Sequence, residues 1–201
     1  MNTFLENELA VEINAAKVTA AIMHLFETHG NREQDGVFLS HTAHMIQCAM
    51  LALRDGAGPE MVLGAFLHDI GHLLKREPRA GLMGPYSLVD HDELGARYLA
   101  ERGFSEKICA LVELHVQAKR YLVATNADYA KKLSEASWQT LQWQGGPMTA
   151  AELQEFRQHP YFKEAIKVRY WDEEARDGQA RLLPLSLFGN LIFNFLSSRI
   201  P

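Results

Sequence analysis

The chain has 201 residues, of which 47% are apolar and 22% are charged, and this length and composition are typical of one globular domain with its own core. The 20 Lys and Arg residues against 25 Asp and Glu residues give a formal net charge of −5, which argues against a nucleic-acid partner. Two cysteines cannot build a disulfide framework, and the first residues lack the pattern of a signal peptide. We therefore expect a cytoplasmic protein.

Apolar residues recur at spacings of three and four along the whole chain, which predicts an all-α fold. The first helix is expected over residues 5–28, and the second begins near Ser40, whose hydroxyl can cap it, and ends at Gly56. A third, nearly all-apolar helix is expected to start at Pro59 and to include residues 61–74. A long loop is expected between Lys75 and Asp90 because this stretch holds two prolines and two glycines.

Helices resume after this loop. Ser105 can cap one of them, and Thr149 with Glu152 forms a capping box for another. The expected helices cover residues 91–102, 107–122, 133–143, 151–159 and 161–174. The apolar tract over residues 182–196 is interrupted by polar residues and is shorter than the roughly 20 residues of a membrane span. We expect it to pack on the domain, with no membrane partner.

The most unusual feature is the presence of nine histidines, since histidine is the commonest protein metal ligand. His68 and Asp69 are adjacent in the apolar third helix, and His72, four residues after His68, is expected one turn further on the same face. Burying these groups is costly without partners, and a cation would supply them. For the pair alone, two hydrogen-bonded core residues would be an equally good explanation.

The pair is accompanied by further potential ligands. They are His44, His91, His115 and Asp172. Four histidines and two carboxylates exceed the needs of one ion with an open position and are the right number for two. Imidazole with carboxylate suits iron, manganese or zinc better than calcium or magnesium, and Asp69 is the natural bridge because it has two oxygens. His41, one turn before His44, is an alternative ligand.

The order of these residues resembles the HD-domain superfamily of metal-dependent phosphohydrolases, and also its small branch of mixed-valent di-iron oxygenases. The flanking tracts HVQAKRYLV (115–123), LSEASWQTLQWQGGPM (133–148) and KVRYWDE (167–173) are similar to oxygenases that cleave the C–P bond of 2-amino-1-hydroxyethylphosphonate. The resemblance runs, with interruptions, from about residue 44 to 172. It implies an HD-domain helical bundle, with residues 1–201 forming one domain and the metal-binding core at about 40–175.

The resemblance also implies the cofactor and the partners. The cofactor would be two iron ions in a mixed-valent Fe(II)/Fe(III) pair, and the partners a small hydroxyphosphonate and O2. One iron would be held by His44, His68, Asp69 and Asp172. The other would be held by Asp69, His91 and His115. No feature of the sequence specifies the oligomeric state.

Two cations lie one helical turn from proposed ligands. Lys119 follows His115 by four residues and Arg169 precedes Asp172 by three, so both are expected to point toward the metals. A compact ammonium and a planar guanidinium suit phosphonate oxygens, although both could instead balance the carboxylates. The resemblance adds His72 and Ser137 as substrate donors, and we expect Asp69, His72 and Lys119 to be catalytic.

One position bears on the choice of phosphonate. The glycine-forming relatives have an acidic residue seven positions before the first metal histidine, which binds the substrate's primary ammonium, and here that position is Val37. A quaternary ammonium has no N–H to donate and is bound by apolar or aromatic groups. The sequence therefore favours a trimethylammonio hydroxyphosphonate, with glycine betaine and phosphate as products. The alternatives are the amino substrate with glycine as product, an HD phosphohydrolase, or a non-catalytic HD module.

Overall fold

The computed structural model describes residues 3–31, 39–74, 90–133 and 135–199. Within these ranges it has ten α-helices, one 3-10 helix and no strand, so the prediction of an all-α fold is confirmed. The helices are α1 (Thr3–His29), α2 (His41–Arg54), α3 (Pro59–Leu67), the 3-10 helix η1 (Ile70–Leu73), α4 (His91–Ala100), α5 (Glu106–Thr125), α6 (Ala127–Lys132), α7 (Glu135–Trp143), α8 (Ala150–Arg157), α9 (Phe162–Glu174) and α10 (Leu185–Ser197).

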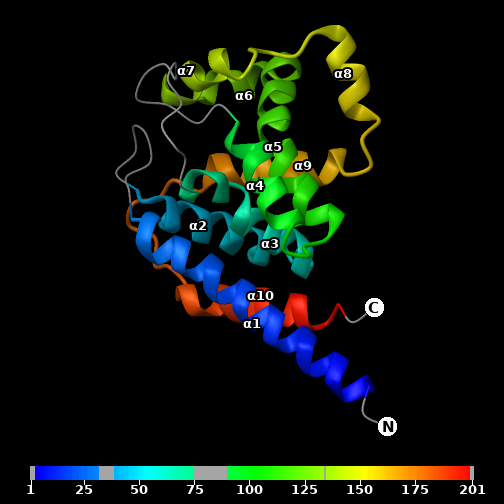
Figure 1. The fold of residues 1–201 in the computed structure, drawn as a ribbon. Helices are drawn as coiled ribbons and strands as arrows, with labels where there is room; N and C mark the ends of the chain where they lie inside the picture. The colour runs from blue at the N-terminus through cyan, green and yellow to red at the C-terminus, as the bar shows by residue number, and fades with distance from the viewer. Residues whose placement is uncertain (1–2, 32–38, 75–89, 134, 200–201) are drawn as a thin grey trace, which may run out of the picture.

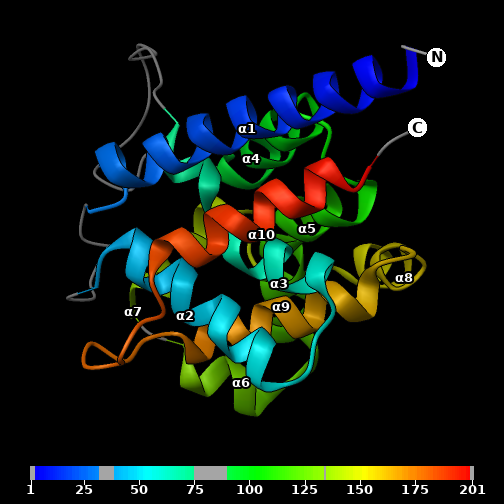
Figure 2. The ribbon, with the colours of Figure 1, turned by 90° about the horizontal axis from the view of Figure 1, so that it is seen from below.

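Helices α2, α3, α5 and α9 form the centre of the bundle, with α3 packed on both α2 and α5 and with α9 packed on α2 and α5. Helices α1 and α10 lie side by side along one face, and α6, α7 and α8 lie at the opposite end (Figures 1 and 2). The Phe66 ring of α3 stacks between Phe26 of α1, at 4.7 Å, and Phe188 of α10, at 4.5 Å. Burial of these three rings joins the two terminal helices to the centre of the bundle.

The predicted caps are confirmed. The Ser40 hydroxyl accepts from the backbone N–H of Ala43, and the Ser105 hydroxyl accepts from that of Ile108. The capping box of Thr149 and Glu152 is formed at the start of α8. These bonds satisfy amides that have no partner within their own helix, and they fix where α2 and α5, which carry proposed ligands, begin.

The prediction of one helix through residues 61–74 is wrong. Helix α3 ends at Leu67, and the chain continues as η1 from Ile70, so His72 does not lie one α-helical turn above His68. Close packing explains the change of direction. A Cβ atom on Gly71 would lie 1.9 Å from the carbonyl oxygen of His91, so the missing side chain allows η1 to approach the start of α4. The prediction of a long loop and the assignment of Val37 concern residues 75–89 and 37, which are outside the described part of the chain.

Helix α1 includes a segment, Glu8–His29, that is long and apolar enough to cross a membrane by length and composition. The same criterion is met by core helices of soluble proteins and by signal sequences, so this is weak evidence for a membrane span. Ile22 and Phe26 of this segment are fully buried in the core cluster. The absence of a membrane partner stays a prediction.

Candidate metal centre

The four histidines and two aspartates selected from the sequence meet inside the bundle. Helix α2 supplies His44 and the junction between α3 and η1 supplies His68 and Asp69. The other three are His91 at the start of α4, His115 in α5 and Asp172 in α9. Each is at most 5% exposed. Six ionisable side chains from five segments thus converge in a site with little access to water.

The first half of the site, which we call half-site A, consists of His44, His68 and Asp172 with one oxygen of Asp69. His44 Nε2 lies 3.2 Å from His68 Nε2 and 3.2 Å from Asp172 Oδ1. Asp69 Oδ2 lies 3.4 Å from His68 Nε2 and 3.8 Å from His44 Nε2. Two nitrogens and two carboxylate oxygens therefore face one small volume.

The second half, half-site B, uses the other oxygen of Asp69. His91 Nε2 and His115 Nε2 are 3.0 Å apart, and each is 3.4 Å from Asp69 Oδ1. His72 Nε2 lies 3.9 Å from the same oxygen. Asp69 thus has one oxygen in each half-site, which is the arrangement expected of a bridging carboxylate.

The other ring nitrogens show which atoms are available as ligands. In three of the histidines Nδ1 faces a backbone carbonyl, which can only accept a hydrogen bond, so Nδ1 carries a proton and Nε2 is the atom left to bind a cation. The distances are 2.9 Å from His44 to Ala175, 2.8 Å from His68 to Ala65 and 2.6 Å from His115 to Val112. Two lone pairs 3.2 Å apart in half-site A repel each other unless a cation lies between them.

This donor set fits a pair of metal ions. Two nitrogens bound to one ion at about 2.1 Å and at a right angle are about 3 Å apart, close to the separations in both half-sites. Mixed imidazole and carboxylate donors suit first-row transition metals. In the described part of the chain two groups of side chains lie close enough to share a metal ion, and neither includes a cysteine. They are His44 with His68 and Asp172, and Asp69 with His72 and His91.

The electrostatics of the site also favour cations. Burial would raise the pKa of Asp69, but the neighbouring His68, His115 and His91 hold it well below its usual range. Burial acts in the same way on Asp172, and Arg169 and His44 more than offset it. Both carboxylates are therefore ionised. The Asp69 charge raises the pKa of His68 well above its usual value despite complete burial. Half-site A therefore holds a positive charge, which is a proton on His68 Nε2 in the metal-free protein and would be a metal ion in its place when one binds.

Lys119 and Arg169 are both buried beside the site, as their spacing predicted. Burial, followed by the charge of Arg169, lowers the pKa of Lys119 to about 7, and its ammonium donates to Thr140 Oγ1 at 3.2 Å. Arg169 donates to Asp172 Oδ2, the oxygen that does not face His44 Nε2, and also to Glu173 and to the Tyr129 hydroxyl. Arg169 thus balances carboxylates, which was the alternative interpretation of this residue.

His72 lies at the edge of the site, and Ser137 is linked to it through Arg176 and Glu173. The His72 ring stacks on His91 at a centroid distance of 4.1 Å and on His41 at 5.0 Å, which places His41 against His72 rather than among the atoms facing Asp69. Ser137 is in α7, and its hydroxyl accepts from Arg176 at 3.1 Å.

Sequence reasoning did not select Arg176 or Glu173, although Glu173 follows Arg169 by four residues, a spacing typical of helical ion pairs.

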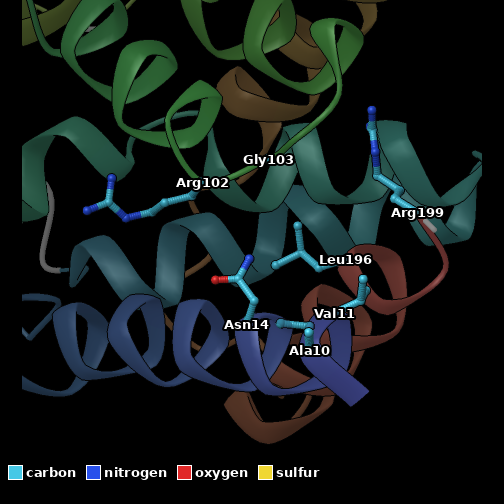
Figure 3. Close-up of a pocket in the computed structure, with 8 residues that line it drawn as sticks. Ala10, Val11, Asn14, Arg102, Gly103, Leu196 and Arg199 are labelled. Carbon is cyan, nitrogen blue, oxygen red and sulfur yellow. The ribbon is translucent and has the colours of Figure 1, made fainter. Parts of the chain in front are cut away.

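A surface groove of about 320 Å³ is lined by a different set of residues (Figure 3). It runs between α1, the turn that follows α4, and the C-terminal part of α10, and is lined by Ala10, Val11, Asn14, Arg102, Leu196 and Arg199. None of the six proposed ligands lines it. We therefore assign the chemistry to the buried centre and not to this groove.

Comparison with known proteins agrees with this geometry. Residues 41–177, which include all six proposed ligands, match the family described as HD domain. The chain belongs to the HD-domain family. One relative of this HD-domain protein is [1-hydroxy-2-(trimethylamino)ethyl]phosphonate dioxygenase (glycine-betaine-forming) of Leisingera caerulea. The two are 39% identical over 170 residues, which are 82% of this chain and 83% of the relative.

Two further relatives cover similar lengths. Hydroxymethylphosphonate dioxygenase of Gimesia maris is 35% identical over 180 residues, 88% of this HD-domain protein and 89% of the relative. An uncharacterized protein of Acanthamoeba polyphaga mimivirus is 36% identical over 176 residues, which are 88% of this HD-domain protein and 80% of the relative. The resemblance to HD-domain phosphonate oxygenases is confirmed, and so is the prediction of an oxidoreductase.

Proposed function

We propose that this HD-domain protein is a di-iron dioxygenase that cleaves the C–P bond of 1-hydroxy-2-(trimethylammonio)ethylphosphonate. The products are glycine betaine and phosphate. C1 is oxidised to the carboxylate and O2 is reduced. One oxygen atom of O2 is added to C1 and the other to phosphorus, while the C–P, C1–H and O–O bonds break. The observation that carries the proposal is the 39% identity to the glycine-betaine-forming enzyme over 82% of the chain.

The ligand assignment follows the two half-sites. His44, His68, Asp69 and Asp172 would hold one iron. Asp69, His91 and His115 would hold the other. When bound, the iron pair supplies redox chemistry toward O2 and positive charge toward the oxygens of the substrate. The chain keeps three histidines in the tautomer that leaves Nε2 free, so the ligands are organised before the ions arrive.

The remaining residues bind and orient the substrate. The Lys119 ammonium, buried beside the two carboxylates, pairs with the phosphonate, whose charge favours the protonated form of this lysine. The Ser137 hydroxyl donates to a phosphonate oxygen, and so does Arg169, whose guanidinium has five N–H groups and uses three nitrogens for Tyr129, Asp172 and Glu173. Burial and the nearby His91 hold the pKa of His72 well below its usual value. Its ring is thus neutral and can accept the proton of the C1 hydroxyl in a hydrogen bond.

The choice of the trimethylammonio substrate rests on Val37 and on the Leisingera relative. A second candidate is hydroxymethylphosphonate, because the Gimesia maris dioxygenase is similar over 88% of the chain. The amino substrate is disfavoured by the absence of a carboxylate at position 37. All three share a hydroxyl on the carbon attached to phosphorus, so the same buried centre serves each.

The test is an assay of iron-loaded protein with the trimethylammonio, amino and hydroxymethyl phosphonates side by side. Oxygen uptake and phosphate release are followed together, and p-nitrophenyl phosphate serves as a phosphate ester. We expect one phosphate per O2 consumed and the highest kcat/KM with the trimethylammonio compound. A higher value with another phosphonate would overturn the substrate assignment. Phosphate release from the ester without oxygen would identify a phosphohydrolase instead.

A further inference from the structure

Glu173 contacts two arginines with its two carboxylate oxygens. It lies in the last turn of α9, directly after the proposed ligand Asp172. Its Oε2 accepts from Arg169 Nη2, and its Oε1 lies 3.0 Å from Arg176 Nη2. The side chain is only 16% exposed. Water therefore competes little for either contact, and both are stronger than pairs on the surface.

The two arginines reach different parts of the site. Arg169 donates through Nη1 to Asp172 Oδ2, and the other oxygen of Asp172 lies 3.2 Å from His44 Nε2 in half-site A. Arg176 donates through Nη2 to the hydroxyl of Ser137 in α7. One carboxylate thus connects a proposed metal ligand in α9 with a proposed substrate donor in another helix.

A carboxylate suits this place better than any other side chain. Guanidinium groups only donate, so the group between them must accept on both sides, and a carboxylate accepts on both and also offsets their charge. A glutamine accepts on one side only and presents an NH2 group to the other arginine. An alanine would leave both guanidinium groups without this acceptor. The residue can therefore be tested by an almost isosteric change.

We propose that Glu173 is a positioning residue that orients Asp172 through Arg169 and orients Ser137 through Arg176. The first effect concerns only the metal centre. The second rests on the proposed function, because it assumes that Ser137 binds the phosphonate. Direct partners of metal ligands, as Arg169 is of Asp172, typically contribute 10–100-fold to metal affinity or activity, so an effect of Glu173 through Arg169 is large enough to measure.

The test compares Glu173→Gln with Glu174→Gln. Glu174 is the adjacent acid and also pairs with an arginine, Arg54, at 3.0 Å, but its side chain is 56% exposed. Iron affinity is measured by anaerobic titration of metal-free protein, and KM is measured with the trimethylammonio hydroxyphosphonate. We expect Glu173→Gln to weaken iron binding at one of the two sites at least 10-fold and to raise KM about 10-fold. We expect Glu174→Gln to change the iron affinity and KM by less than two-fold.

Arg176→Met separates the two effects. It removes the contact to Ser137 and leaves Arg169 in place, so KM should rise while iron affinity stays within two-fold of the wild type. If the glutamine variant does not fold, Glu173→Asp, which keeps the charge, is the second variant for the same test. It should also weaken iron binding, because the shorter side chain cannot reach both arginines. Glu173 variants with wild-type iron affinity would overturn the proposal. If the wild type turns over no hydroxyphosphonate, the proposed function fails alone, since the iron titration needs no substrate.

Discussion

Asp69 is the residue on which the two half-sites depend, because each of its oxygens faces a different pair of histidine nitrogens. Asp69→Asn keeps the shape but replaces one accepting oxygen with an NH2 donor that cannot bind a cation. We expect iron affinity to fall at least 100-fold in one half-site and turnover to be lost, measured by iron titration and oxygen uptake. Asp128→Asn, at a side chain 84% exposed, is the control and should match the wild type. Full activity of the Asp69 variant would exclude a bridging carboxylate.

Lys119 gives the site a pH dependence. Burial and the charge of Arg169 lower its pKa to about 7, so the free protein loses this cation as the pH rises through 7. An anionic phosphonate should therefore bind more weakly at higher pH. Lys119→Met lacks the charge at every pH, so its binding defect should be largest near pH 6 and shrink toward pH 9. Calorimetry of anaerobic iron-loaded protein with the hydroxyphosphonate measures the affinity of the wild type and of the variant at each pH. A defect that is constant over this range would contradict the role of the ammonium.

Much of the site at the residue scale could be predicted, and the reasons differ between residues. His68 and Asp69 stand out because two polar groups interrupt an apolar run. Lys119 and Arg169 could be placed because helical spacing fixes which side chains share a face. The contact of Arg176 with Ser137, 39 residues away, could not, since it joins α7 to the segment that follows α9 and no local spacing relates the two.

At the scale of elements, the break between α3 and η1 decides where Asp69 points. In a continuous helix its carboxylate would follow the α-helical rotation, whereas the structure has Asp69 at φ −101° and ψ 13° before η1 begins. The sequence did not show this break because residues 61–74 contain no proline and only glycines that a buried helix tolerates. Helix α6 was also missed. It has six residues, and its start is set by the Asn126 side chain.

Gly71 controls the approach of η1 to α4. A Cβ atom there would lie 1.9 Å from the His91 carbonyl oxygen, so Gly71→Ala must push the start of α4, and with it His91, away from Asp69. We expect at least 10-fold weaker iron binding in half-site B, measured by anaerobic titration. The control is Gly58→Ala, where the added atom meets nothing within 4 Å. Equal iron affinity in both variants would show that the packing of η1 on α4 does not set this half-site.

At the scale of the whole molecule, the family match does not include either terminal helix. Helix α1 and helix α10 lie outside residues 41–177, yet both pack on α3, whose C-terminal end leads directly to His68 and Asp69. The sequence predicted that residues 182–196 would pack on the domain, and the burial of Phe188 and Ile192 confirms this. The helix against which these residues pack could not be predicted, because apolar periodicity shows which face of a helix is buried but not which other helix covers that face.

Phe188 tests whether this packing supports the metal centre. Its ring is fully buried and stacks on Phe66 at 4.5 Å, so Phe188→Ala should lower the free energy of unfolding by about 3–5 kcal/mol. Leu187→Ala, at the adjacent position and 36% exposed, should cost about 1 kcal/mol or less. Urea denaturation of metal-free protein gives both values. Because this substitution changes none of the six ligands, iron-loaded Phe188→Ala should have the wild-type kcat when it is assayed well below its unfolding temperature. A lower kcat in folded protein would show that α10 shapes the metal centre itself.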